Sequence, residues 1–226
     1  MENPGTRTSL PKPPLRTLTT PRLRLRTLTT NDAEASMRLL TREDVMRWTS
    51  REKVETLEQC TRWLEDRTLG KECFNFAIEL RGVDGTTGEE GCSGLIGMVG
   101  SFQFPGLGYM IHPDYAGKGY ATEAVKAIIP ALWDHMPCAS DDGIGYDYLE
   151  GLTDTENYAS QNILRKCGFT YCETREQDFY NPTLKQQRDT AFYRLARPGK
   201  DLEKLGLLPL KESSEADEPG FVPPIQ

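Results

Sequence analysis

Two glycines separated by one residue, Gly117 and Gly119, stand directly before a stretch with helical character, in the segment DYAGKGYATEAV at residues 114–125. The N-terminus of a helix presents unpaired N–H groups and a partial positive charge, which together attract an anion. Glycines in front of it adopt positive φ angles and let a phosphate approach the backbone, because no Cβ stands in the way. The pattern therefore predicts an anion site. Two glycines also shape ordinary strand-to-helix turns, so the neighbouring elements must decide between these interpretations.

Two familiar phosphate-binding signatures do not fit this segment. A P-loop requires GxxxxGK followed by Ser or Thr, whereas Lys118 stands between the two glycines. A dinucleotide-binding fingerprint follows the first strand of a βαβ unit and carries a third glycine, at a position that Thr122 occupies here. A nucleotide-binding α/β protein is therefore a disfavoured alternative, and preference for a nicotinamide or adenine nucleotide would indicate it.

The elements before the glycines follow from hydrophobic periodicity. Apolar residues nearly alternate with arginine in RLRLRTL at 22–28, which predicts a strand. Asn31 followed by Glu34 resembles a capping box that opens a helix, and VMRWTS predicts a second helical region. Thr56 and Gln59 form another capping signature. The third helix, which they open, is expected to place four residues on one face: Leu57, Cys60, Trp63 and Leu64.

The hydrophobic period then changes to two. Three segments predict consecutive antiparallel strands: FNFAIEL (74–80), CSGLIGMVGSF (92–102) and GLGYMIHP (106–113), with the Gly-rich turn VDGTTGEEG between the first two. The helix after the glycines is predicted for residues 120–135, with a kink at Pro130 because proline removes a hydrogen bond. After a loop with Asp141, Asp142 and Gly143, the remaining predicted elements are a strand at 145–153, a helix at 157–166 closed by Gly168, and two strands, FTYCETRE and TAFYRLAR.

The two ends differ from this folded part in composition. Residues 1–20 are basic and rich in proline and threonine, so they predict an extended arm, with an organellar transit peptide as an alternative. The hexapeptide LRTLTT of this arm recurs at 25–30, either by chance or because the first copy adds an edge strand. The folded domain is predicted for residues 21–197, and residues 198–226, which are acidic and lack periodicity, are predicted to form a tail.

Composition limits the class of protein. The chain has 226 residues, of which 37% are hydrophobic, enough for one packed domain. No apolar run is long enough to cross a bilayer, and the N-terminus lacks the apolar centre of a secretory signal. The formal net charge of -7 argues against a nucleic-acid binder and mildly favours cationic partners such as amines. Six cysteines and two histidines show no metal-ligand spacing, so we predict reduced thiols, no metal and a cytoplasmic location.

The order of these elements, together with three motifs, resembles a known family. The motifs are TPRLRLRTLTTNDA, LGYMIHPDYAGKGYATEAV and NYASQNILRKCGF. They resemble the GNAT superfamily of acyl-CoA-dependent N-acetyltransferases, in particular its RimJ/RimL-like branch, over about residues 20–197. The resemblance implies an α+β fold with a mixed, mostly antiparallel central sheet flanked by helices. It also implies a monomer or homodimer that transfers an acetyl group from acetyl-CoA to a primary amine, either a protein N-terminus or a small molecule, by direct attack in a ternary complex.

The same resemblance implies where acetyl-CoA binds. Backbone amides of residues 117–121 would hold the CoA pyrophosphate, behind Ala116, where the superfamily has Gln or Arg. The segment 109–111 would pair by its backbone with the pantetheine arm. Asn157 and Ser160, one helical turn apart, would contact pantetheine near the sulfur, although a helix cap and a solvated face also explain these two residues. The complete set of expected ligands is Met110, Ile111, Ala116, Gly117, Lys118, Gly119, Tyr120, Ala121, Thr122, Asn157 and Ser160.

Acetyl transfer also needs an oxyanion stabiliser and a proton for the leaving thiolate. The resemblance implies that a backbone N–H of Met110 or Ile111 serves the thioester oxygen. Ser160 is the expected acid, because Leu164 fills the position of the superfamily's more usual tyrosine. The candidate catalytic residues are Tyr109, Glu150 and Ser160.

The general base requires a separate assignment. Many relatives carry a glutamate where this chain has Gly106, so a base must come from elsewhere: Glu150 on the next strand, His112 or Asp114, directly or through water. For His112 a structural role is the favoured interpretation. The missing carboxylate also supports a second hypothesis, a non-catalytic acyl-CoA-binding or regulatory module.

Overall fold

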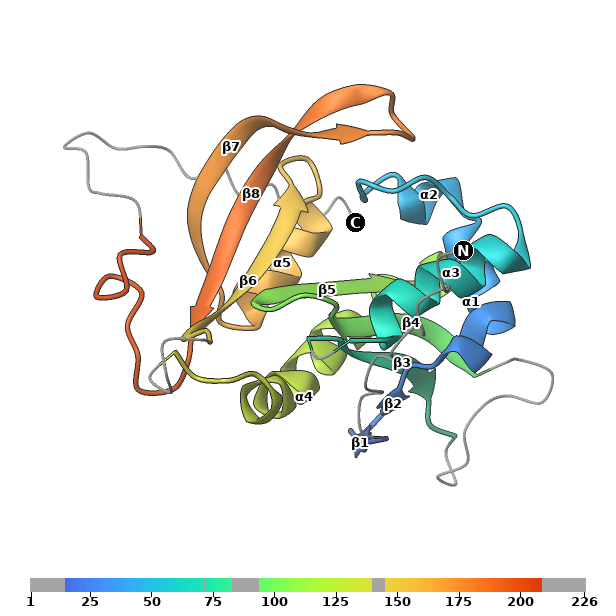
Figure 1. The fold of residues 1–226 in the computed structure, drawn as a ribbon, viewed down its shortest axis with the longest axis horizontal. Coiled ribbons are helices and arrows are strands. Elements are labelled where there is room, and N and C mark those ends of the chain that lie inside the picture. The colour runs from blue at the N-terminus through green and yellow to red at the C-terminus, as the bar shows by residue number, and fades with distance from the viewer. Residues whose placement is uncertain (1–14, 71, 83–93, 140–144, 209–226) are drawn as a thin grey trace, which may run out of the picture.

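An eight-stranded sheet forms the centre of the structure, with the strand order β1-β2-β3-β4-β5-β6-β8-β7 (Figure 1). The computed structural model describes residues 15–70, 72–82, 94–139 and 145–208. All neighbouring strands are antiparallel except β5 and β6, which run parallel. The strands are β1 (Thr17–Thr19), β2 (Leu23–Thr27), β3 (Phe74–Leu80), β4 (Leu95–Ser101), β5 (Gly106–Ile111), β6 (Tyr148–Asp154), β7 (Thr170–Asn181) and β8 (Gln186–Ala196). This confirms the predicted α+β fold with a mixed, mostly antiparallel sheet.

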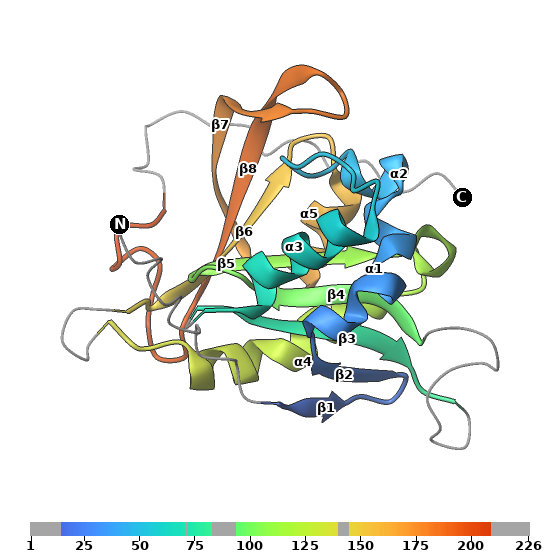
Figure 2. The same ribbon diagram turned by 45° about the vertical axis from the view of Figure 1, so that its right-hand side comes forward.

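Helices cover both faces of the sheet. The α-helices are α1 (Ala33–Leu40), α2 (Glu43–Met46), α3 (Leu57–Thr68), α4 (Tyr120–His135) and α5 (Tyr158–Lys166). One buried core joins α4 and α5 to residues from both ends of the sheet, including Phe74, Leu149 and Tyr193. A second core lies under α1, α2 and α3, and Met110 packs against it. In Figure 2, α1 and α3 lie above β3 and β4, and α4 lies below them.

The capping signatures in the N-terminal helices were partly right. Thr56 and Gln59 form the predicted capping box: the Gln59 N–H donates to Thr56 Oγ1 at 3.2 Å and the Thr56 N–H donates to Gln59 Oε1 at 3.2 Å. The box predicted at Asn31 and Glu34 was wrong. Asp32 instead accepts from the Thr29 N–H at 2.8 Å, and a short 3-10 helix, Thr30–Asp32, precedes α1. On α3, Leu57 is also displaced from the expected face, because its side chain is 52% exposed while Cys60 and Leu64 are buried.

The last two strands are longer than predicted. The segment 178–189 was expected to connect them, but β7 runs to Asn181 and β8 begins at Gln186, so only a four-residue turn remains. An irregular register between Arg175 and Phe179 lets β7 bend and continue. The hairpin therefore extends well beyond the rest of the sheet, toward α2 (Figure 1).

The remaining predictions concern single elements. α4 continues through Pro130 to His135, so the proline does not end it. Gly168 has φ +89°, as a left-handed cap after α5 requires. The first LRTLTT copy supplies β1, an edge strand that pairs with β2. The turn VDGTTGEEG, the loop at 141–143, residues 1–14 and residues 209–226 lie outside the described residues.

Candidate active site

The glycine turn has the backbone conformation that the sequence predicted. Gly117 has φ +74° and Gly119 has φ +81°, and α4 begins at the next residue, Tyr120. A Cβ placed on Gly117 would meet no atom within 4 Å, so the turn faces open space. Because Gly119 has no side chain to cap the helix, the N–H groups of the first turn are left for a ligand. This arrangement suits the oxygens of a phosphate.

An ion pair from the start of β2 holds this turn in place. Arg22 donates from Nη1 to the Lys118 carbonyl at 2.9 Å and from Nε to Glu123 Oε2 at 2.7 Å. Its guanidinium also lies over the Tyr120 ring, 4.6 Å from the centroid. Glu123 accepts in addition from the Thr20 hydroxyl at 2.6 Å and from the Arg22 N–H at 3.0 Å. We call this set of contacts the Arg22–Glu123 clamp.

Strands β5 and β6 separate just beyond their first contacts. They pair only at Gly106 with Glu150 and at Leu107 with Gly151, and beyond these residues β5 has one free edge. The His112 N–H donates to Ile96 on the β4 side, whereas the Pro105 carbonyl accepts from Glu150 on the β6 side. Successive backbone groups of a strand point in opposite directions. The N–H groups of residues 109 and 111 therefore point into the split, and that of residue 110 points toward β4.

Two hydroxyl groups meet on the α5 side of the split. Tyr109 Oη lies 2.8 Å from Ser160 Oγ and 3.0 Å from the Ser160 carbonyl oxygen. Burial raises the pKa of Tyr109, against the lowering effect of its hydrogen bond with Ser160, so the phenol stays protonated. Asn157 is the N-cap of α5, since its side chain accepts from the Ser160 N–H at 3.1 Å. The helix cap proposed as one role of Asn157 is therefore present.

The glycine turn, the split and the hydroxyl pair all come from residues 106–160, and the sequence profile described as "Acetyltransferase (GNAT) domain" matches residues 22–170. The chain belongs to the GNAT acetyltransferase family. The acetyltransferase is 25% identical over 190 residues to "Uncharacterized N-acetyltransferase YoaA" of Bacillus subtilis (strain 168), covering 80% of this chain and 97% of that relative. The predicted family and the acetyl-CoA cosubstrate are thereby confirmed.

Solved structures share the fold of the acetyltransferase. RimL, a ribosomal L7/L12 alpha-N-protein acetyltransferase in complex with CoA, is 15% identical with a TM-score of 0.61, covering 82% of this chain and 100% of that one. RimJ of Mycobacterium smegmatis, in complex with CoA-disulfide, is 16% identical with a TM-score of 0.59, covering 85% of this chain and 94% of that one. The RimJ/RimL-like branch suspected from the sequence is thus represented among the structural neighbours.

In the acetyltransferase, Glu150 lies on the sheet face that carries α1 to α3. Its neighbour Gly151 points to the other face, where an added Cβ would come within 2.5 Å of Leu164. The Glu150 carboxylate is 18% exposed and lies 2.8 Å from Arg194 Nε. Arg194 also binds Glu173 at 3.0 Å and the Leu207 carbonyl at 3.0 Å. Glu150 is thus a held carboxylate, directly beside Gly106 in the parallel register.

The other two candidate bases occupy different surroundings. His112 is 7% exposed, caps the 3-10 helix Pro113–Tyr115, and accepts from the Asp114 N–H at 3.3 Å. Burial lowers the pKa of His112, despite the opposing effect of Asp114. The Asp114 carboxylate is 76% exposed, and the main-chain carbonyl of Asp114 accepts from Lys118 Nζ at 2.9 Å. Both residues belong to the short segment that precedes the glycine turn.

Sequence reasoning missed three charged residues around the site: Arg22, Glu123 and Arg194. Arg22 looked like the polar half of an alternating strand, and Glu123 like an ordinary first-turn acid. The pairing of Arg22 with Glu123 joins positions 101 residues apart, which no local pattern reveals. Within the described ranges, no group of three or more His, Cys, Asp or Glu side chains could hold a metal ion, and no helix is long and apolar enough to cross a membrane.

Proposed function

We propose that the acetyltransferase acetylates a primary amine, of a small molecule or of a protein N-terminus, by direct attack of the amine in a ternary complex. The observation that carries this proposal is the split between β5 and β6. The glycine turn lies beyond one end of β5, two backbone N–H groups point into the gap, and a carboxylate stands where the strands part. Donor and acceptor can therefore meet from opposite faces of the sheet.

In this proposal the cosubstrate is held mainly by backbone. The N–H groups of residues 117–121 bind the pyrophosphate, and the free edge of 109–111 pairs with the amides of pantetheine, as an added strand would. The N–H of Ile111 or Tyr109 then stabilises the negative charge that develops on the thioester oxygen. Acetyl-CoA supplies the activated acetyl group when bound.

The hydroxyl pair Tyr109–Ser160 is the proposed source of the proton for the leaving thiolate. The protonated Tyr109 phenol has one proton and two acceptors within reach, the Ser160 carbonyl at 3.0 Å and Ser160 Oγ at 2.8 Å. In this proposal it donates to Oγ during the reaction, which leaves the Ser160 proton free for the thiolate. A hydroxyl that receives one hydrogen bond is a better donor in the next one, since polarisation along a chain strengthens each bond. Ser160 is thus the acid, and Tyr109 positions it.

Glu150 is the proposed general base. Paired residues of neighbouring strands project to the same face, so Glu150 stands beside the position at which many relatives carry a glutamate and this chain carries Gly106. Arg194 holds the carboxylate in one orientation. The Glu150 carboxylate would accept the proton from the amine, directly or through one water.

Substitution of Glu150 by glutamine tests this assignment. The change keeps the shape and removes the base, so kcat/KM for the amine should fall by about 10²–10⁴-fold while the affinity for acetyl-CoA is kept. Glu173→Gln is the matched control, because Glu173 binds the same Arg194 guanidinium. Retained turnover in Glu150→Gln, or an equal loss in both variants, would reject the role of Glu150.

A non-catalytic acyl-CoA-binding module is the second candidate, favoured by Gly106 and by the engagement of Glu150 with Arg194. Mass spectrometry of products from a panel of amines and peptides, with acetyl-CoA, separates the two. Acetylated product supports the enzyme, whereas tight acetyl-CoA binding without product supports the module. We further propose a cytoplasmic monomer or homodimer.

A further inference from the structure

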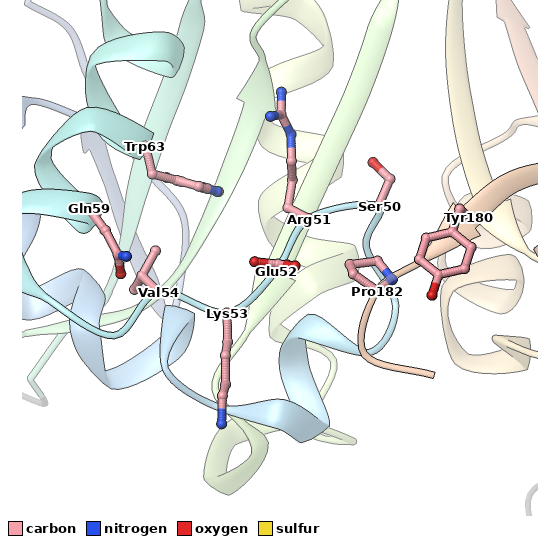
Figure 3. A pocket seen from close by; sticks show the side chains of 9 residues that line it. All are labelled: Ser50, Arg51, Glu52, Lys53, Val54, Gln59, Trp63, Tyr180 and Pro182. Carbon is pink, nitrogen blue, oxygen red and sulfur yellow. The ribbon is translucent and has the colours of Figure 1, made fainter. Parts of the chain in front are cut away.

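A cavity of about 510 Å³ lies between the α2–α3 connection and the end of the β7–β8 hairpin (Figure 3). Residues 50–54 form one wall, Trp63 of α3 the second, and Tyr180 with Pro182 the third. The helix α3 covers the sheet face to which Glu150 projects. The core beneath α3 contacts Met110 of β5, and Met110 lies on the same face as Gly106, the residue paired with Glu150. The cavity therefore belongs to the face from which an amine would approach.

A buried hydrogen bond fixes the two walls relative to each other. Asn181 is 0% exposed, and its side-chain Nδ2 donates to the Arg47 carbonyl at 2.7 Å. Its Oδ1 accepts from the Leu184 N–H at 2.9 Å, which ties the same amide to the hairpin turn. We call this the Asn181 latch. It joins segments 134 residues apart, so the cavity is a built feature and not a gap between unrelated loops.

The lining of this cavity includes an unpartnered hydrogen-bond donor and two basic side chains. Trp63 Nε1 is buried and has no hydrogen-bond partner among the described residues. Figure 3 shows this nitrogen on the side of the ring that faces Arg51. An indole N–H can only donate, so it needs an acceptor atom. Arg51 and Lys53 line the cavity against a single acid, Glu52.

A second guanidinium lies behind Trp63. Arg67 stacks on the indole ring, 3.6 Å from its centroid, and also lies 5.2 Å from the centroid of Phe102. No carboxylate of the part of the chain that the structure describes forms an ion pair with it; its bond is to the Trp63 carbonyl at 3.3 Å. Burial, and then repulsion by Arg51, lowers the pKa of Arg67 to about 10. The two arginines thus repel each other, and Asp66 and Glu52 offset their positive charge only in part.

We infer that the acceptor amine belongs to a molecule that also carries an oxyanion, a carboxylate or a phosphate, and that this cavity binds that group through Arg51 and the Trp63 N–H. The inference rests on the proposed function and names the substrate class of the same site. The oxyanion has two sources: a small anionic amine, or an acidic side chain near the N-terminus of a peptide. Both present the same chemistry to the cavity.

Paired acceptors test the inference and distinguish the two sources. The small-molecule arm compares γ-aminobutyrate with γ-aminobutyramide and phosphoethanolamine with ethanolamine. The peptide arm compares Ser-Glu-Glu-Ala with Ser-Gln-Gln-Ala, both amidated. We expect the anionic member to have a kcat/KM at least about tenfold higher in one arm, since hydrogen bonds to charged groups are the stronger ones. Equal or better use of the neutral members in both arms overturns the inference.

Substitutions in the cavity test whether the preference for the anionic acceptor arises there. Arg51→Gln should abolish the preference for the anionic acceptor and leave the KM for acetyl-CoA unchanged. Trp63→Phe, which keeps the ring on Arg67 and removes the N–H, should reduce the preference. Arg62→Gln is the matched control, because Arg62 lies on α3 with a 68% exposed side chain and pairs with Glu58 outside the cavity. A preference that survives Arg51→Gln, or is lost equally in Arg62→Gln, counts against the site.

A binding measurement keeps this inference separate from the proposed function. Glutarate and inorganic phosphate are titrated calorimetrically into the wild-type protein and the Arg51→Gln variant. Binding of either anion that is lost in the variant supports the cavity even if no amine is acetylated, in which case the proposed function alone fails. If no amine is acetylated and neither anion binds, the inference is overturned.

Discussion

Replacing Arg22 by alanine tests the Arg22–Glu123 clamp. The change removes the bond from Nη1 to the Lys118 carbonyl at 2.9 Å and both guanidinium contacts with Glu123, at 2.7 and 2.6 Å. It leaves the main-chain bond from residue 22 to Glu123 and the bond from Thr20. The turn then loses its link to β2 through Lys118, while Glu123 keeps two partners.

The magnitude follows from the exposure of these groups. The Arg22 side chain is 48% exposed, so its ion pair with Glu123 contributes only about 0–1 kcal/mol. The bond to the Lys118 carbonyl has a charged donor, and we take the lower end of its usual range, about 1.5 kcal/mol. Since this bond fixes the turn that we propose to bind pyrophosphate, acetyl-CoA should bind about tenfold more weakly.

Isothermal titration with acetyl-CoA measures this effect. Arg24→Ala is the control, because Arg24 lies two residues further along, on β2, and pairs with Glu79 at 3.5 Å, away from the turn. We expect the dissociation constant to rise in Arg22→Ala and to stay near the wild-type value in Arg24→Ala. Wild-type affinity in a folded Arg22→Ala protein, or equal weakening in both variants, would refute the role of the clamp.

Two further predictions concern titratable groups of the site. Tyr109→Phe removes the partner of the Ser160 hydroxyl and should lower kcat about three- to tenfold, with the KM for acetyl-CoA unchanged; an unaltered kcat would show that Tyr109 does not position the acid. Burial raises the pKa of Glu123, but the hydrogen bonds from Thr20 and Arg22 outweigh this effect, so the pKa lies below its ordinary value of 4.5. The carboxylate therefore stabilises the fold above pH 4.5 and less as the pH falls further, so the difference in Tm between wild type and Glu123→Gln should narrow below pH 4.5. A difference that is constant with pH would contradict this.

Much of the fold could be predicted because its signals are local. The alternation at 22–28, the capping box at Thr56 and the two positive-φ glycines each depend on residues within one turn or strand. One error in the fold arose from a tertiary contact. Thr29 is the cap instead of Asn31 because Arg26 also holds Asp32, at 2.6 and 3.0 Å, and no sequence pattern shows that contact.

The site was less predictable than the fold, since it depends on contacts between distant segments. The sequence placed Ser160 and Tyr109 on separate elements, and only the folded chain brings their hydroxyls to 2.8 Å. The parallel register that sets Glu150 beside Gly106 is likewise a property of the whole sheet. The hairpin end beyond Phe179 looked like a loop, because the bulge interrupts its alternation.

The narrow contact between β5 and β6 has a consequence for how the protein unfolds. Only two residue pairs join the halves of the sheet, and the core under α1 to α3 contains residues of the first half alone. The halves are otherwise bound mainly through the core under α4 and α5, together with the Asn181 latch and the contact between Tyr109 and Ser160. A pantetheine chain paired along the open edge of β5 would act as a short additional strand between the two halves. Binding of acetyl-CoA would then make the two halves unfold as one cooperative unit. The cosubstrate would thus determine the cooperativity of unfolding as well as the activity of the enzyme.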